Sequence, residues 1–348
     1  AIPSSTEAEN KDKTKGATVL DPIRGFHKDP VCTLDFASLY PSIMQWKNMC
    51  YTTKVDKEYA RKYLGSNDVY DPIPGTDPPY RFVKPHIHSG ILPRMLKMLL
   101  GRRKIAKGDL KRETDPFKRA VLDGRQLALK IVANSVYGFV KANMVCDKDL
   151  MSAVTGWGRN MISDTKRIAE TYPRCQVVYG DTDSVMVKMV GATLEETFAI
   201  GEQIAKECTK YFGSPHVLEL EKVYWPYLLI GKKKYAGKKY MSKDAEPKLA
   251  SSGLENVRRD NAKIASVNLE KSLHTLLMEG DVQKAIDHIH SVLRDLMLGK
   301  TDLSQLIITK GLTKTKKQYN ESIAQQPHAE LAKRIAKRSL TTGETVPH

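Results

Sequence analysis

The sequence predicts an α+β fold in which antiparallel strands and long helices pack together. The strand prediction rests on two short β-branched runs, at residues 176–178 and 185–187, which flank a turn that contains Gly180 and Asp181. This pattern is typical of a tight hairpin. The helix prediction rests on four segments with apolar residues at helical spacing, at 91–113, 116–137, 155–172 and 194–212.

Composition limits the class of protein. The 348 residues suffice for two or three domains, and 41% hydrophobic residues can form a sizeable core. The formal net charge of +16 is typical of a protein that neutralises phosphates, and a basic protein without a polyanionic partner is the alternative. Five scattered Cys without a C-x-x-C pair favour a reducing, intracellular setting. No apolar run approaches the ~18 residues of a membrane span.

The hairpin turn carries two carboxylates, Asp181 and Asp183, two positions apart. Two acids on a rigid tip repel each other unless a cation lies between them, and hard oxygen ligands suit Mg²⁺. An Asp-rich surface turn is the alternative. Spacing alone does not rank Asp181, because residues i and i+2 share a face on a strand but not necessarily at a turn.

A second acid, Asp35, lies near the end of an apolar strand at 31–36, and Pro41 then suits the first turn of a helix. Asp35 is therefore a candidate metal ligand, with helix capping as the alternative. Backbone N–H groups are free at such a strand-to-helix turn, so Ser38 and Leu39 are candidates for binding phosphate oxygens.

The helices at 91–113 and 116–137 are separated by a short Thr-Asp-Pro link, which predicts an antiparallel pair. Arg103 and Lys107 are four residues apart and share one face. The second helix has one polar stripe, while Leu127 and Ile131 are expected to pack elsewhere. A solvated basic face is the alternative. The stripe consists of Gln126, Lys130, Asn134 and Tyr137.

The remaining segments carry fewer signals. Residues 1–15 are expected to be a disordered lead-in, and 56–85 an irregular connection with one short helix at most. An apolar strand at 228–231 runs into a basic segment with interspersed Tyr, which suits contacts to a nucleic-acid strand. Further helices are expected at 262–278, 282–298 and 327–338.

Five blocks in this order resemble the family B DNA polymerases. Residues 35–44 (DFASLYPSIM) resemble the first palm motif, Lys130 with 133–138 (ANSVYG) the fingers motif, and 179–184 (YGDTDS) the second palm motif. Residues 232–235 (KKKY) resemble the block that grips primer–template duplex, and 252–260 (SGLENVRRD) the entry to the thumb. The connecting sequence most resembles the eukaryotic replicative delta type and its relatives in large DNA viruses.

The resemblance implies a subdivision of the chain into palm, fingers and thumb. It places the palm at 16–90 and 141–250, as an antiparallel sheet with packed helices. It places a helical-hairpin fingers at 91–140 and an incomplete, mostly helical thumb at 251–348. The proofreading exonuclease that usually precedes the first palm motif is not expected in this chain.

The resemblance also implies an activity, which is DNA-templated addition of deoxynucleotides to a primer 3′-hydroxyl, with two Mg²⁺ ions as cofactor. Asp35, Asp183 and the Phe36 carbonyl would be the ligands, and Asp181 a third candidate acid. Lys130 could also protonate the leaving pyrophosphate.

Other residues acquire roles from the same resemblance. Those that would hold the nucleotide are Ser38 and Leu39 at the phosphates, Tyr40 under the sugar, Arg103, Lys107 and Lys130 at the triphosphate, Asn134 beside it and Tyr137 at the nascent base pair. Those that would hold DNA are Gly138, Lys233, Lys234, Tyr235, Arg258 and Arg259.

The expected partners are primer–template DNA and deoxynucleoside triphosphates, with a sliding clamp and accessory subunits through regions outside this chain, in the nucleus or at a viral replication site. No membrane partner is expected. Two alternatives stay open. A non-catalytic DNA-binding relic would be expected to lose an acid or part of the Lys130 stripe. A reverse transcriptase would carry Tyr-x-Asp-Asp where this chain has Tyr-Gly-Asp-Thr-Asp.

Overall fold

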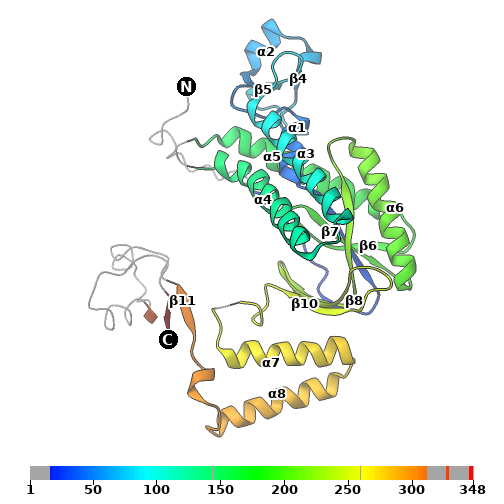
Figure 1. Cartoon of the computed structure of the whole chain (residues 1–348), viewed down its shortest axis with the longest axis vertical. Helices are drawn as coiled ribbons and strands as arrows, with labels where there is room; N and C mark the ends of the chain where they lie inside the picture. Colours follow the sequence, from blue (N-terminus) through cyan, green and yellow to red (C-terminus); the bar gives the residue numbers. More distant parts are fainter. Residues whose placement is uncertain (1–15, 143–144, 259, 312–326, 329–344, 348) are drawn as a thin grey trace. The chain divides into compact units, whose positions relative to one another are not determined.

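The computed structural model describes residues 16–142, 145–258, 260–311, 327–328 and 345–347 (Figure 1). These residues form two compact units, which belong to the ranges Ala1–Ile23 with Asp29–Val223 and Arg24–Lys28 with Tyr224–His348. The predicted lead-in at 1–15 lies outside the described residues, as does nearly all of the predicted helix at 327–338. Within the described ranges, no helix is long and apolar enough to cross a membrane.

The first unit is built around a mixed set of strands and helices, which confirms the α+β prediction. Its sheet has the order β8-β2-β7-β6, and both β2 with β7 and β6 with β7 pair antiparallel. The predicted hairpin is confirmed as β6 and β7. The strands are β2 (Val31–Phe36), β6 (Cys175–Asp181), β7 (Ser184–Met189) and the first part of β8 (Leu218–Gly231).

Among the helices that contribute to the core of this unit are α1 (Leu39–Trp46), α5 (Lys148–Ala169) and α6 (Leu194–Phe212). Helix α6 has the predicted bounds, with a capping box at its start. Helix α5 begins well before the predicted residue 155, because the Asp147 side chain caps it by accepting hydrogen bonds from two backbone N–H groups.

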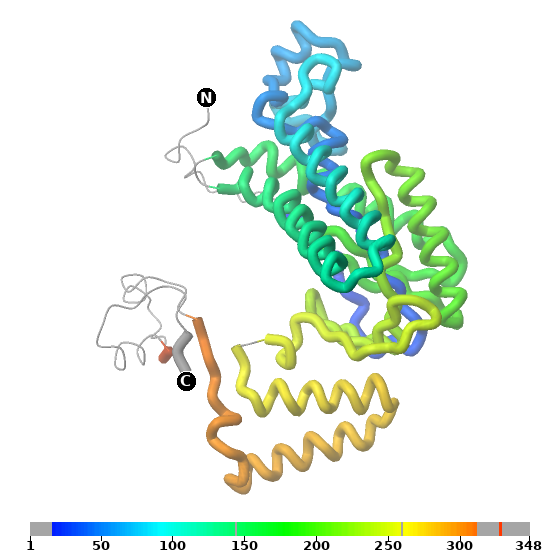
Figure 2. The backbone as a smooth tube through the Cα atoms, in the orientation of Figure 1, coloured from blue at the N-terminus to red at the C-terminus, as the bar shows by residue number. Residues whose placement is uncertain are grey.

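The predicted antiparallel helix pair is present as α3 (Ile91–Arg112) and α4 (Pro116–Val140). Figure 2 shows the two helices side by side, joined by a short link. The Asp115 carboxylate caps α4 by accepting the Lys118 N–H at 2.8 Å, and the proline follows in the first turn as expected.

One packing expectation on α4 was wrong. Leu127 and Ile131 do not enter the core, since they are 48% and 61% exposed. The buried side of α4 is formed instead by Ala133, Val136 and Val140, which lie on a different face. The apolar periodicity alone did not distinguish the two faces, because this helix carries apolar residues on both.

Residues 56–85 are more regular than expected. They contain α2 (Lys57–Tyr63) and, with the preceding residues, a small antiparallel sheet of order β3-β5-β4. Its strands are β3 (Lys54–Asp56), β4 (Val69–Tyr70) and β5 (Tyr80–Val83). Strands this short show no readable alternation, and the turns between them dominate the local sequence.

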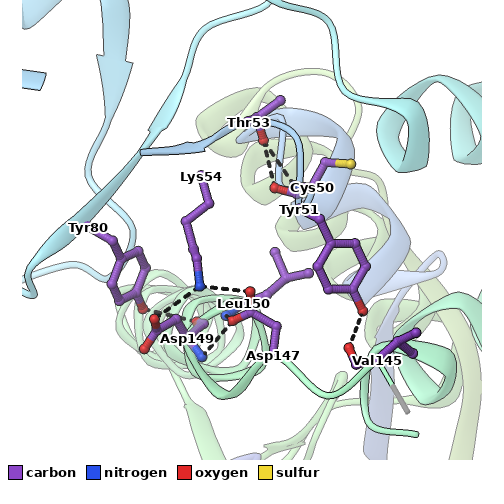
Figure 3. A network of polar contacts seen from close by, with 9 residues as sticks. All are labelled: Cys50, Tyr51, Thr53, Lys54, Tyr80, Val145, Asp147, Asp149 and Leu150. Atoms are coloured by element: carbon purple, nitrogen blue, oxygen red, sulfur yellow. Dashed lines mark hydrogen bonds and ion pairs between the residues drawn. The ribbon is translucent and has the colours of Figure 1, made fainter. Parts of the chain in front are cut away.

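A polar network ties this small sheet to the start of α5 (Figure 3). The Lys54 ammonium donates to the carboxylates of Asp147 and Asp149 at 2.7 and 3.2 Å. The Tyr80 hydroxyl donates to the Asp149 carbonyl at 2.9 Å. The Asp147 carboxylate is largely buried, so its charge is both paired and hydrogen-bonded, as a buried carboxylate requires.

In the second unit the strand order is β10-β9-β8, and β1 also pairs with β8. The basic segment after residue 231 is a separate strand in a hairpin, not a continuation of the strand at 228–231. The turn holds Lys233 at a left-handed φ of 62°. Besides the rest of β8, the strands are β1 (Gly25–His27), β9 (Lys234–Tyr240) and β10 (Lys248–Ser252).

The predicted helices at 262–278 and 282–298 are confirmed as α7 (Lys263–His274) and α8 (Val282–Met297). A small core packs α7 and the turn after it against β9. The remaining elements are β11 (Thr309–Gly311), which pairs with β12 (Thr345–Pro347), and the short turns η2 (Ser66–Asp68), η3 (Thr275–Glu279) and η4 (Leu303–Gln305).

One buried histidine lies in the first unit without a polar partner. His216 is 1% exposed, and neither ring nitrogen has a hydrogen-bond partner in the described part of the chain. Its ring meets the rings of Trp46 and Phe212 edge-on, with centroids 5.0 and 6.5 Å away. Burial and, to a lesser extent, the nearby charge of Lys47 lower the pKa of His216 to about 4.

His216 should therefore destabilise the protein in acid. Its folded pKa lies below the ordinary value of 6.5, so its neutral form costs nothing above pH 6.5 and stability is lost as pH falls toward 4. The slope is up to ~1.4 kcal/mol per pH unit in that window. We expect His216→Phe to show a shallower loss of unfolding free energy in urea titrations between pH 6.5 and 4. Equal slopes for both proteins would contradict this.

Candidate active site

A cavity of about 390 Å³ lies in the first unit, where the end of β2 turns into α1. Most of the residues predicted to hold metal or nucleotide surround it. Its walls come from the turn after β2, from α3 and α4, from the β6–β7 turn and from β8. The lining residues are Asp35, Phe36, Ala37, Ser38, Leu39, Tyr40, Pro41, Arg103, Lys107, Lys130, Asn134, Thr182, Asp183, Glu219 and Glu221.

Strand pairing brings the two principal acids together. The register of β2 on β7 places Asp35 opposite Ser184, the residue after Asp183. The Phe36 N–H donates to the Asp183 carbonyl at 2.9 Å, which fixes the β6–β7 turn beside the end of β2. Asp181 is the last residue of β6 and is not among the cavity's lining residues, so its role as a ligand stays a prediction.

The cavity concentrates negative charge. Burial, with repulsion from Asp183 and Glu221, raises the pKa of Asp35 to about 7, although Lys130 and Lys222 act in the opposite direction. Burial likewise raises the pKa of Asp183. Both carboxylates thus lack full compensation from the protein, and a bound cation would supply it.

The donor set fits a hard divalent metal. The lining includes the carboxylates of Asp35, Asp183, Glu219 and Glu221, and carboxylate oxygen is a ligand type that Mg²⁺ prefers. Across the described ranges, no three His, Cys, Asp or Glu side chains form a complete metal-binding cluster.

Removing one of these charges should stabilise the metal-free protein. Asp35→Asn keeps the shape of the side chain but ends the repulsion, and we expect a gain of about 1 kcal/mol, which is a rise in Tm of a few degrees. Adding Mg²⁺ should raise the Tm of the wild type more than that of the variant, because binding to the folded state stabilises it. Calorimetry with and without Mg²⁺ measures both effects. An unchanged metal-free Tm would contradict the charge argument.

Cationic and polar side chains from α3 and α4 form the opposite wall. The Arg103 guanidinium donates to the Ser38 hydroxyl at 3.4 Å and to the Gln126 carbonyl oxygen at 3.5 Å. Ser38 precedes α1 in a left-handed conformation (φ 55°, ψ 58°), and its side chain does not cap the helix. Lys107 and Lys130 also line the cavity. A helix N-terminus and three cations together favour a polyanionic ligand.

Two tyrosines adjoin this wall. The rings of Tyr40 and Tyr137 lie 4.6 Å apart at an angle of 52°. A Cβ at Gly158 of α5 would lie 3.3 Å from the Tyr40 ring, so glycine leaves room for the ring there. Tyr40 lines the cavity, whereas Tyr137 is not among the lining residues and contacts the Tyr40 ring. Gly138, the next residue on α4, is exposed.

Five lining residues were not among the site residues predicted from the sequence, namely Ala37, Pro41, Thr182, Glu219 and Glu221. The two glutamates lie on β8, two positions apart in the run Leu218-Glu219-Leu220-Glu221. Strict apolar–acidic alternation puts both acids on one face of a strand. That alternation was the available signal, but only the sheet order shows that this face meets the cavity.

The second unit holds most of the predicted DNA contacts. The turn between β8 and β9 packs on Gly253, where an added Cβ would lie 1.9 Å from the Lys233 carbonyl oxygen. Two of the resembling blocks, at 232–235 and 252–260, therefore meet through their backbones. Tyr235 packs among the rings of Tyr224 and Tyr227, with centroids 6.1 and 5.6 Å away.

Two of these cations are paired with acids. The Lys234 ammonium lies 2.9 Å from the Glu255 carboxylate, and Arg258 makes two hydrogen bonds to Asp260 at 3.0 and 2.8 Å. Both pairs are largely exposed, so a phosphate could replace the carboxylate at little cost. Arg259 lies outside the described residues.

Comparison with known proteins agrees with the motifs. The sequence model of DNA polymerase family B matches residues 1–348. The chain belongs to DNA polymerase family B. Members of this family generally use divalent metal ions.

Relatives of this family B chain include proteins named DNA polymerase delta catalytic subunit. The proteins of Schizosaccharomyces pombe, Oryza sativa and Bos taurus are 46%, 45% and 43% identical to it over 99%, 98% and 98% of its length. The aligned region is 32%, 31% and 32% of those proteins. The chain thus spans about a third of the length of these relatives.

Proposed function

We propose that this chain is the catalytic core of a DNA-templated DNA polymerase, which joins a deoxynucleotide to a primer 3′-hydroxyl and releases pyrophosphate. The observation that carries the proposal is one cavity where two mutually repelling acids, Asp35 and Asp183, face Arg103, Lys107 and Lys130. The family membership of the chain and the names of its relatives also support this proposal. In this proposal 16–90 and 141–250 form the palm, 91–140 the fingers and 251–348 the thumb.

Asp35, Asp183 and the Phe36 carbonyl would hold two Mg²⁺ ions, with Asp181 as a further candidate. Bound there, the ions would lower the pKa of the primer hydroxyl and neutralise the charge that develops on the phosphates. Strand pairing leaves Asp35 and Asp183 little freedom to move, so their carboxylates would fix the position of the ions at the end of β2.

The cationic wall would bind the triphosphate. Arg103 and Lys107 would hold its terminal phosphates, and the backbone at Ser38 and Leu39 would add N–H donors. As the 3′-oxygen bonds to the α-phosphorus, the bond from that phosphorus to the bridging oxygen breaks. Lys130 would then donate a proton to an oxygen of the leaving pyrophosphate.

Sugar and base would meet the polar stripe of α4 and the tyrosine pair. Asn134 lies beside Lys130 on the lining, and Tyr137 would line the pocket of the nascent base pair. Tyr40 would lie under the sugar, where Tyr137 on one side and Gly158 on the other limit its movement. A ribose 2′-hydroxyl would then clash with its ring.

Tyr40→Ala should therefore weaken the discrimination against ribonucleotides. We expect the ratio of kcat/KM for dNTP over rNTP to fall at least ~10-fold, because a steric clash that costs a few kcal/mol is removed. Single-nucleotide incorporation with both substrates measures the ratio. Tyr63→Ala, at an exposed position of α2, is the control and should leave it unchanged. Unchanged discrimination in Tyr40→Ala would refute the steric role.

Duplex DNA would be held by Gly138 and by the second unit, through Lys233, Lys234, Tyr235, Arg258 and Arg259. A net charge of +16 supports such a polyanionic partner. A sliding clamp and accessory subunits would act through regions outside this chain. We place the protein in the nucleus or at a viral replication site.

Primer extension on a DNA template with Mg²⁺ tests the proposal directly. A non-catalytic relic would bind primer–template but not extend it, and a reverse transcriptase would prefer an RNA template. Because the chain spans a third of its relatives, a protein with the flanking regions joined on should be assayed in parallel. Failure of both proteins to extend a DNA-templated primer would overturn the proposal.

A further inference from the structure

A second cavity, of about 320 Å³, lies in the first unit and shares no lining residue with the candidate active site. It is bounded by the end of α1, by β4 and the loop after it, by β5 and by α5. Its lining residues are Lys47, Val69, Tyr70, Asp71, Ile73, Pro74, Gly75, Thr76, Asp77, Arg81, Lys84 and Trp157. Its volume suits a mononucleotide-sized ligand.

The loop that forms one wall is held firmly against α5. Gly156 allows this approach, since a Cβ there would lie 2.8 Å from a methyl carbon of Ile73. The Trp157 indole N–H donates to the Asp71 carbonyl at 3.3 Å. The cavity is thus built by specific packing between segments far apart in the sequence.

The carboxylates that line this cavity already have cationic partners. The Arg81 guanidinium lies 3.6 Å from the Asp71 carboxylate and also pairs with Asp77, which binds Lys57 as well. Arg81 donates in addition to two backbone carbonyls. Arg81 and these two acids therefore compensate one another.

Two lysines of the lining remain. The Lys47 ammonium lies over the rings of Trp46, Trp157 and Tyr70, at 3.6, 4.0 and 5.0 Å from their centroids. The Lys84 ammonium lies 5.4 Å from the centroid of the Tyr70 ring, which Lys47 also contacts. In the described part of the chain, neither ammonium has a carboxylate within ion-pair distance.

The surroundings of Lys47 disfavour an isolated positive charge. The pKa of Lys47 is lowered to about 8, mainly by burial; Asp71 partly opposes this shift, and repulsion from Lys84 adds to it. Both ammonium groups lie close to the Tyr70 ring, and an anion bound within reach of both would stabilise their charges.

We propose that this cavity is a second anion site, in which Lys47 and Lys84 bind a phosphate group and Tyr70 and Trp157 offer aromatic surface to the attached nucleoside. Phosphate oxygens match ammonium donors, and bases stack on aromatic rings. The phosphate is either that of a single-stranded nucleic acid or that of a free phosphate ester. The proposal goes beyond the polymerase function and does not depend on it.

Tryptophan fluorescence tests the site, because Trp46 and Trp157 both contact Lys47. The protein has three tryptophans, so a Trp225→Phe background leaves only these two. Arg103→Ala with Lys130→Ala in the same background weakens phosphate binding in the candidate active site. Titration with sodium phosphate, thymidine monophosphate and a dodecamer of deoxythymidine should give a saturable change that matched sodium chloride does not.

The lysine variants decide whether the signal comes from the proposed site. We expect Lys47→Met and Lys84→Met each to raise Kd at least tenfold, while Lys47→Arg retains binding. The matched control is Lys62→Met, whose ammonium lies 5.1 Å from the Tyr63 ring on exposed α2, and it should bind as the parent does. Lys84 is only half-buried, so its variant provides the test even if Lys47→Met does not fold.

The three probes distinguish the sources of phosphate. A Kd per phosphate at least tenfold lower for the dodecamer than for the monophosphate assigns the site to single-stranded nucleic acid. Equal values assign it to a free phosphate ester. The absence of a saturable change, or unchanged binding in Lys84→Met, would overturn the site. Neither result bears on primer extension, so the polymerase proposal stands or falls separately.

Discussion

Asp183→Asn is expected to reduce the rate of nucleotide incorporation by about 10³-fold or more, which corresponds to ~4 kcal/mol of transition-state stabilisation. The side chain keeps its size, but the cavity loses one of its two repelling acids and with it most of its affinity for divalent metal. Binding of primer–template should stay the same or become tighter, because a negative charge near the DNA is removed.

Two measurements separate this effect from damage to the fold. Single-turnover incorporation gives the chemical rate, and fluorescence anisotropy with labelled primer–template gives the DNA Kd. The control is Asp109→Asn, which changes an acid of α3 that pairs with Arg112 at 2.7 Å, and this variant should incorporate at the parental rate. If Asp183→Asn extends primers as fast as the wild type, the metal assignment is wrong.

Lys130→Met should be the second most damaging change. Lys130 lines the cavity together with the acids and the cations of α3, so its ammonium would contact the triphosphate and the leaving pyrophosphate. A charge-assisted hydrogen bond of this kind contributes about 1.5–3 kcal/mol, so we expect kcat/KM for the nucleotide to fall by roughly 10²-fold. Steady-state incorporation at varied dNTP concentration measures it.

Whether kcat or KM accounts for the lower kcat/KM tests the role of Lys130. Lys118→Met, near the start of the same helix and away from the cavity, is the matched control and should keep the parental kcat/KM. Lys130→Arg preserves the charge and should restore phosphate binding, so that KM for the nucleotide returns toward the parental value. A kcat that stays low in Lys130→Arg, with a changed pH profile, supports proton donation. An unchanged kcat/KM in Lys130→Met would refute contact with the triphosphate.

Local sequence was sufficient for much of the secondary structure. The β6–β7 hairpin follows from two β-branched runs around Gly180, and α4 begins where Asp115 and a first-turn proline predict. These features depend on neighbouring residues, since a turn or a cap is decided within a few positions. The strands at 54–83 were not predictable in this way, because runs of two to four residues give no periodic signal.

The motifs by themselves identified Asp35 and Asp183 as acids of one site, and they identified the cations on two helices. Only the tertiary structure decided which side chains share the cavity. Strand pairing placed Asp35 opposite Ser184, and the sheet order brought Glu219 and Glu221 to the same cavity. The packing of α4 also leaves Leu127 and Ile131 exposed. Sequence spacing fixes which residues share a face of one element, but which faces meet depends on long-range packing.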